Sequence, residues 1–160
     1  MTLVFGYGSN MDDAQMDQRC PARAKVGIAV LHDHRLCFPR LSNTRQCGVS
    51  SVEPSPGDVV WGVVHRLGVE DLAALDRSEG YRADRLPRQN GYNRLPVRVE
   101  IDGVVTSVDT YIATATRNPP PPSEAYLRHI CDGASQHSLP EFYRQYLHRL
   151  AITYGCSFDM

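Results

Sequence analysis

The chain has 160 residues, with 17 basic and 18 acidic side chains and a formal net charge of −1 at pH 7. This length predicts one domain over residues 1–160, and the balanced charge excludes the basic surface typical of a dedicated nucleic-acid binder. A hydrophobic fraction of 42% is enough for one sizeable core, which excludes a disordered chain.

Strand signals dominate the first two thirds of the chain. The β-prone runs, rich in branched and aromatic residues, lie at 3–5, 26–31, 35–38, 49–52 and 58–67. The second and third runs form either two strands or one interrupted strand, and a Pro-Ser-Pro-Gly turn signal precedes the last run. Residues 95–101 and 104–113 flank Asp102-Gly103, which predicts a tight hairpin because both residues tolerate positive φ.

Helices are predicted nearer the C-terminus. Residues 69–76 place Leu72 and Leu75 on one face, with Gly80 beyond the end. The tract 118–122, an asparagine followed by four prolines, cannot be helical and is expected to run extended over the surface. Strands followed by a few helices predict an α+β fold.

Two further helices are predicted after the proline tract. Ser123 suits the N-cap of the first of them, which carries Tyr126. Ser138 and Glu141 have the spacing of a capping box for the second. Aromatic side chains of this last helix could serve either the core or the interface of a homodimer.

No segment of the sequence has the length or composition of a signal peptide or a membrane span, so no membrane partner is expected. The five cysteines are widely spread, and no two have CxxC spacing. Reduced thiols in a cytoplasmic protein, with no disulfide framework and no zinc site, are therefore expected.

The segment after the first strand is the first candidate site. Gly6, Tyr7, Gly8, Ser9 and Asn10 combine two glycines with short polar residues, which leaves successive backbone N–H groups unshielded. Such groups can bind a carboxylate, a phosphate or a developing oxyanion. The glycine spacing matches neither GxGxxG nor a P-loop, which disfavours nucleotide binding. The alternative is an ordinary turn.

Glu79 is the second candidate, because it lies at the C-terminal end of a predicted helix. The negative end of the helix dipole and burial beside Tyr81 would both raise its pKa, giving a carboxyl that exchanges protons near neutral pH. Arg77 and Arg82 would oppose this shift if they face the carboxyl. The alternative is a solvated glutamate before a C-cap glycine, Gly80.

Two weaker candidates remain. His32 and His34 share one face of a strand, but no third metal ligand is evident, so a surface pair is the alternative. A basic stretch follows Glu79 and consists of Arg82, Arg85, Arg88, Arg94 and Arg98. Its default interpretation is a solvated face, although it could contact an anionic part of a substrate.

Four sequence blocks, taken in order, resemble the γ-glutamylcyclotransferase family. They are FGYGSNM at 5–11, SPGDVVWGVVHRL at 55–67, LDRSEGY at 75–81 and PPSEAYLRHICDGASQHSLPEFYRQYL at 121–147. The last block, with its ICxGA and LPxxY elements, resembles the principal γ-glutamylcyclotransferases more than the glutathione-specific branch, which usually has a YGSL-type loop.

The resemblance implies a small mixed β-barrel with surrounding helices and a reaction without a cofactor. In that reaction the α-amino group of a γ-glutamyl amide attacks its own side-chain carbonyl, expels an amine and leaves 5-oxoproline. The family's acid–base glutamate falls on Glu79 and its substrate-cradling loop on residues 6–10. Tyr126 matches a substrate-contacting tyrosine, and Tyr92 takes the place of another family tyrosine.

Two alternatives to this activity stay open. One keeps the chemistry but changes the substrate to γ-glutamylamines or to a γ-glutamyl intermediate of a dedicated pathway. The other is a protein that binds a γ-glutamyl compound or 5-oxoproline without turnover. The segment 81–92 is longer and richer in arginine than in the principal enzymes, so Arg82, Arg85 or Arg88 is expected to favour an anionic leaving portion.

Overall fold

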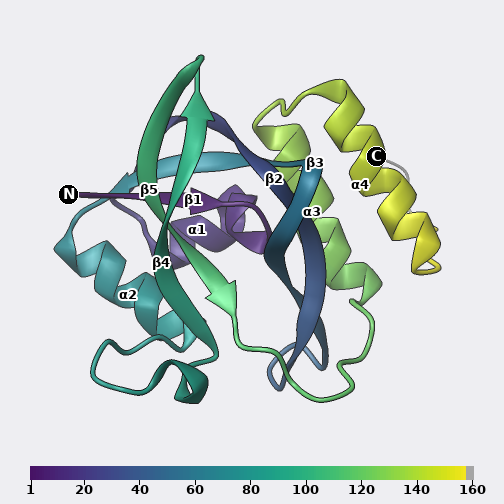
Figure 1. The fold of residues 1–160 in the computed structure, drawn as a ribbon, viewed down its shortest axis with the longest axis horizontal. Coiled ribbons are helices and arrows are strands. Elements are labelled where there is room, and N and C mark those ends of the chain that lie inside the picture. The colour runs from purple at the N-terminus through teal and green to yellow at the C-terminus, as the bar shows by residue number, and fades with distance from the viewer. Residues whose placement is uncertain (158–160) are drawn as a thin grey trace.

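Five strands and four helices make up the part of the chain that the computed structural model describes, residues 1–157; the last three residues of the predicted domain lie outside it. The strands are β1 (Thr2–Gly6), β2 (Ala24–Ser42), β3 (Cys47–Leu67), β4 (Tyr92–Ile101) and β5 (Val104–Ala113) (Figure 1). The helices are α1 (Asp13–Arg19), α2 (Val69–Glu79), α3 (Glu124–Gln136) and α4 (Glu141–Thr153), with short 3-10 turns at Ser9–Met11 and Pro87–Gln89.

The strands pair in the order β1-β3-β2-β4-β5 and close as a barrel. Most neighbours are antiparallel, but β1 meets β5 in parallel through the pair Val4–Asp109. The pair Val30–Glu100 joins β2 to β4. Helices α3 and α4 lie together at one side of the sheet and α2 at another (Figure 1). The α+β class is thereby confirmed.

Of the two longest strands, β2 agrees with one of the predicted alternatives and β3 differs from its prediction. β2 is the single interrupted strand, with shifts in its register. β3, in contrast, runs through the Pro-Ser-Pro-Gly segment, so the prediction of a turn between two separate strands was wrong. The chain between Pro54 and Val59 bulges out of the ladder, because β2 has only Asp33 opposite it. Gly57, with φ of +86°, donates its N–H to Asp33 Oδ1 at 2.9 Å.

The predicted hairpin and the helix predicted at 69–76 are both present. Asp102 and Gly103 have φ of +48° and +80°, which confirms a turn with two positive φ angles. α2 is longer than predicted and continues to Glu79 before ending at Gly80, which adopts the left-handed conformation. The extra turn carries Glu79 to the end of the helix.

Of the two N-caps predicted for the C-terminal helices, one is confirmed and the other is wrong. Ser123 caps α3 by accepting the N–H of Tyr126 at 3.1 Å, as predicted. The capping box at Ser138 was wrong, because this residue has a positive φ of +52° and donates its N–H to Ser135 O. Pro140 takes the N-cap position of α4 instead. No helix within residues 1–157 is long and apolar enough to span a membrane.

Candidate active site

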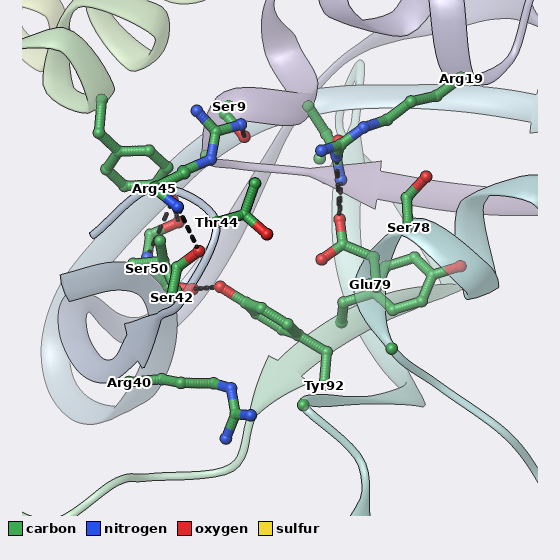
Figure 2. Close-up of a pocket in the computed structure, with 18 of the residues that line it drawn as sticks. Ser9, Arg19, Arg40, Ser42, Thr44, Arg45, Ser50, Ser78, Glu79 and Tyr92 are labelled. Atoms are coloured by element: carbon green, nitrogen blue, oxygen red, sulfur yellow. Dashed lines mark hydrogen bonds and ion pairs between the residues drawn. The ribbon is translucent and has the colours of Figure 1, made fainter. Parts of the chain in front are cut away.

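A cavity of about 670 Å³ lies where β1 ends, beside the C-terminal end of α2 and the loop between β2 and β3 (Figure 2). Every residue that the family resemblance assigned to the site lines it. These are Gly6, Tyr7, Gly8, Ser9, Asn10, Glu79, Tyr92 and Tyr126. The fold therefore brings the glycine-rich segment, the helix-end carboxyl and two distant tyrosines into one space.

The glycine-rich segment approaches β3 closely. A Cβ on Gly8 would lie 2.3 Å from Ser50 Oγ, so a side chain at this position would collide with the strand. Within residues 1–157, no protein acceptor takes the backbone N–H of Gly8, Ser9 or Asn10. The segment therefore has donors available for an anionic or carbonyl oxygen.

Glu79 is held in the cavity wall with its side chain only 11% exposed. Its Oε1 accepts the Asn10 Nδ2–H at 2.7 Å and lies 3.5 Å from Arg19 Nη1 (Figure 2). Burial is the largest influence on the carboxyl and raises its pKa above the ordinary glutamate value, although Arg19 and the Asn10 hydrogen bond counteract part of this rise. The result is a carboxyl suited to exchanging a proton.

Asn10 is oriented by two donors from α1. Its Oδ1 accepts hydrogen bonds from Arg19 Nη1 at 2.9 Å and from Gln15 Nε2 at 3.0 Å. With the oxygen engaged on that side, the amide nitrogen is turned towards Glu79. Helix α1, which the sequence analysis did not predict, thus positions the contact between the loop and the carboxyl.

The arginines nearest the carboxyl differ from the expected ones. The charges that lower the Glu79 pKa come from Arg19 and Arg45, not from Arg77 and Arg82. Arg77 does line the cavity, but Arg82 is exposed and pairs with Asp84 at 2.7 Å. Arg19 and Arg45 belong to α1 and to the β2–β3 loop, where no local motif marks them.

Three tyrosine hydroxyls surround the inner part of the cavity. Tyr126 Oη accepts the N–H of Ser50 at 2.9 Å, and Tyr92 donates its hydroxyl to Ser50 O at 2.6 Å. Tyr7 donates to the carbonyl of Tyr111. Burial raises the pKa of Tyr7, Tyr92 and Tyr126, so all three stay protonated and act as hydrogen-bonding groups.

The weaker candidates lie elsewhere. His32 pairs with Glu100 at 2.7 Å on the exposed surface, and His34 Nδ1 contacts the carbonyl of His32. Within residues 1–157, no cluster of three or more histidine, cysteine or acidic side chains is arranged to hold a metal ion. Of the basic stretch, Arg85 lines the cavity, whereas Arg94 bridges Asp76 and Asp109.

Comparisons with known proteins identify the family and the fold. Residues 59–147 match the AIG2-like family. A γ-glutamylcyclotransferase from Homo sapiens is 33% identical over 150 residues, which cover 91% of this chain and 76% of that protein. The Mus musculus γ-glutamylcyclotransferase is 31% identical over the same length. A solved γ-glutamyl cyclotransferase structure superposes with a TM-score of 0.82 at 32% identity, over 92% of this chain and 86% of that one.

Proposed function

The chain belongs to the AIG2-like family and, within it, to the γ-glutamylcyclotransferases, and from this membership we propose that it converts γ-glutamyl amides to 5-oxoproline with release of the amine. The observation that carries the proposal is the Glu79 carboxyl, which has a raised pKa and lies in the cavity wall, hydrogen-bonded to Asn10 of the glycine-rich loop. The proposed reaction transfers an acyl group from one nitrogen to another, with no change of oxidation state and no carrier group, so the proposal invokes no cofactor.

Glu79 acts in this proposal as general base and then as general acid. The α-ammonium of the substrate is not nucleophilic until it loses a proton, which the Glu79 carboxylate takes. The freed amine attacks the γ-carbonyl, and Glu79 returns that proton to the amide nitrogen as its bond to the carbonyl carbon breaks. The ring nitrogen, which gained positive charge on attack, gives its second proton to the Glu79 carboxylate, and this proton leaves with the departing amine as its ammonium form. A carboxyl with a raised pKa suits both transfers better than an ordinary one.

The loop supplies the positioning. Attack within one molecule forms a five-membered ring, so the protein gains most by holding the attacking conformer. The free N–H groups of Gly8, Ser9 and Asn10 suit either the substrate's α-carboxylate or the γ-carbonyl oxygen as it becomes an oxyanion. Arg45 favours the first role, because its Nη2 lies 3.4 Å from Ser9 Oγ and its Cζ 5.0 Å from the centre of the Tyr126 ring.

The purified protein is expected to release 5-oxoproline and alanine from γ-glutamyl-alanine, as followed by chromatography. Parallel assays with glutathione and with γ-glutamyl-ε-lysine define the range of leaving groups. A folded protein that binds 5-oxoproline but turns over none of these compounds would contradict the cyclotransferase and favour the binding protein. Turnover of γ-glutamylamines alone would favour the related cyclotransferase.

The pH dependence of turnover should depend on Arg19. Since the base must be ionised, kcat/KM is expected to fall as the pH drops through the pKa of Glu79, at a pH above the ordinary glutamate range. Arg19 lowers that pKa, so Arg19→Gln should move the acid limb of the pH–rate profile to higher pH. Arg149→Gln, on the exposed face of α4, is the matched control. An acid limb that stays in place in Arg19→Gln would contradict the role of Glu79 as base.

A further inference from the structure

The cavity is strongly cationic although the whole chain carries a net charge of only −1. Five arginines and one carboxylate, Glu79, line it; the arginines are Arg19, Arg40, Arg45, Arg77 and Arg85. Among residues 1–157, Arg19 pairs with Glu79 at 3.5 Å, and the other four arginines have no ion-pair partner. One substrate carboxylate would leave most of this charge without a counterion.

Arg40 and Arg85 each approach the same stretch of the cavity wall, beside the backbone of Glu79. Gly91 donates its N–H to Gly80 O at 3.2 Å, and Arg85 Nη2 donates to the same carbonyl at 3.1 Å. A Cβ on Gly91 would lie 3.4 Å from Arg40 Nε and Nη2 and 3.3 Å from Glu79 O. Both guanidinium groups therefore reach the bridge formed by the two glycines, next to the backbone of Glu79.

Each of these guanidinium groups has donors to spare. Within residues 1–157, Arg40 donates from Nη1 to Thr114 O at 3.1 Å, and Arg85 donates from Nη2. The Nε of Arg85 is buried and has no acceptor in this part of the chain. A guanidinium carries five N–H donors in a planar fork that matches a carboxylate. The remaining donors of Arg40 and Arg85, other than the occluded Nε of Arg85, are consequently suited to bind anionic oxygens.

The pair lies apart from the arginines near the glycine-rich loop. In Figure 2, Arg19 and Arg45 lie above Glu79 and Tyr92, whereas Arg40 lies below them. If the loop and Arg45 hold the γ-glutamyl group, the reacting carbonyl lies near Glu79. The space beside Arg40 and Arg85 then receives the part of the substrate that departs.

We propose that Arg40 and Arg85 determine leaving-group specificity by binding the two carboxylates of a dicarboxylic amino acid, so that the preferred substrates are γ-glutamyl-glutamate and γ-glutamyl-aspartate. The inference rests on the proposed cyclotransferase function. It narrows the expectation that Arg82, Arg85 or Arg88 favours an anionic leaving portion to Arg85, because Arg82 and Arg88 are exposed and do not line the cavity. γ-Glutamyl derivatives of simple alkylamines, which lack a carboxylate on the leaving group, are poor substrates in this arrangement.

Binding tests the inference without relying on turnover. Isothermal titration of the Glu79→Gln protein compares γ-glutamyl-glutamate with γ-glutamyl-glutamine, which has the same shape but an uncharged side chain. The acidic ligand is expected to bind about 10- to 100-fold more tightly, the range that charge-assisted hydrogen bonds supply. Adding Arg40→Gln and Arg85→Gln should remove the preference, whereas Arg88→Gln should keep it. Equal affinities in the parent protein would overturn the inference.

Conservative variants separate a loss of the binding preference from a loss of folding. Arg40→Lys and Arg85→Lys keep the charge but lose the planar fork, so they should retain part of the preference, and melting temperatures identify any variant that is simply unstable. In the wild-type protein, kcat/KM for the two ligands gives the second readout. Turnover of both at the same rate would overturn the specificity and leave the cyclotransferase intact. A binding preference without any turnover would support the arginine pair while contradicting the proposed reaction.

Discussion

Replacing Glu79 with glutamine is expected to lower the rate of 5-oxoproline release by about 10²- to 10⁴-fold, the usual contribution of a positioned acid–base group. Glutamine has nearly the same shape and can still accept the Asn10 Nδ2–H that Glu79 Oε1 accepts at 2.7 Å. The variant thus keeps the cavity but cannot take the proton from the substrate's α-ammonium. Turnover of γ-glutamyl-alanine measured beside Glu70→Gln, an exposed glutamate in the first turn of the same helix, isolates the effect.

The same variant should be folded and, at neutral pH, at least as stable as the wild type. A carboxyl whose pKa is raised by folding favours the folded state fully below its unfolded pKa, and this contribution is lost as the pH rises through the folded pKa. Glutamine does not ionise, so any gain in melting temperature should appear above the folded pKa and disappear in acid. Wild-type turnover in Glu79→Gln would refute the mechanism, and an unfolded variant would refute the view that the carboxyl serves chemistry rather than the fold.

Gly133→Ala should destabilise the protein and also impair turnover, although alanine is the better helix former by about 1 kcal/mol. α3 packs against the 3-10 turn of the glycine-rich segment at this glycine. A Cβ on Gly133 would lie 2.5 Å from Met11 Cβ, 2.7 Å from Met11 C and 2.9 Å from Asp12 N. Because two of these atoms are backbone, α3 and the turn must separate. We expect the free energy of unfolding to fall by about 1–3 kcal/mol, the usual effect of overpacking.

The loss of turnover follows from the position of Asn10 one residue before Met11. Displacing a positioned group by about 1 Å can lower a rate by about 10²-fold, so kcat should drop in the fraction of the variant that remains folded. Urea denaturation and turnover at a permissive temperature measure the two effects separately. Gly27→Ala is the control, since its nearest neighbour would be Ile101 Cγ2 at an ordinary 3.7 Å. An increase in stability in Gly133→Ala, as helix propensity alone predicts, would contradict the packing argument.

Local signals predicted the parts of the fold that depend on neighbouring residues. The hairpin at Asp102-Gly103 and the Ser123 cap each need only a few adjacent residues, and both were predicted correctly. Gly80 was identified as lying beyond the helix, although the predicted helix ended three residues before the observed one. The bulge before Val59 was mistaken for a turn, because the same residue types interrupt a ladder and reverse a chain. Which of the two occurs depends on pairing with β2, a contact between distant segments.

In the candidate site too, some residues carry a local sequence signal and others are brought together only by contacts between distant segments. The glycine-rich segment and Glu79 carry signals within six-residue windows, so the sequence indicates them directly. Arg19, Arg40 and Arg45 do not, because their proximity to Glu79 and Gly91 arises only when α1, β2 and the β2–β3 loop fold around one cavity. The pKa of Glu79 likewise depends on distant segments, because burial is the largest cause of its rise and burial is a property of the whole fold.

The hydrogen bond from Gly91 N–H to Gly80 O has a consequence for the segment between them. It joins the two ends of the segment. Lengthening a loop whose ends are joined in this way adds little to the entropic cost of closing it. Its composition can therefore change without moving Glu79 on one side or β4 on the other. On the proposed role of Arg85, this segment is a part of the fold through which leaving-group preference can be altered while Glu79 stays in place for ring closure.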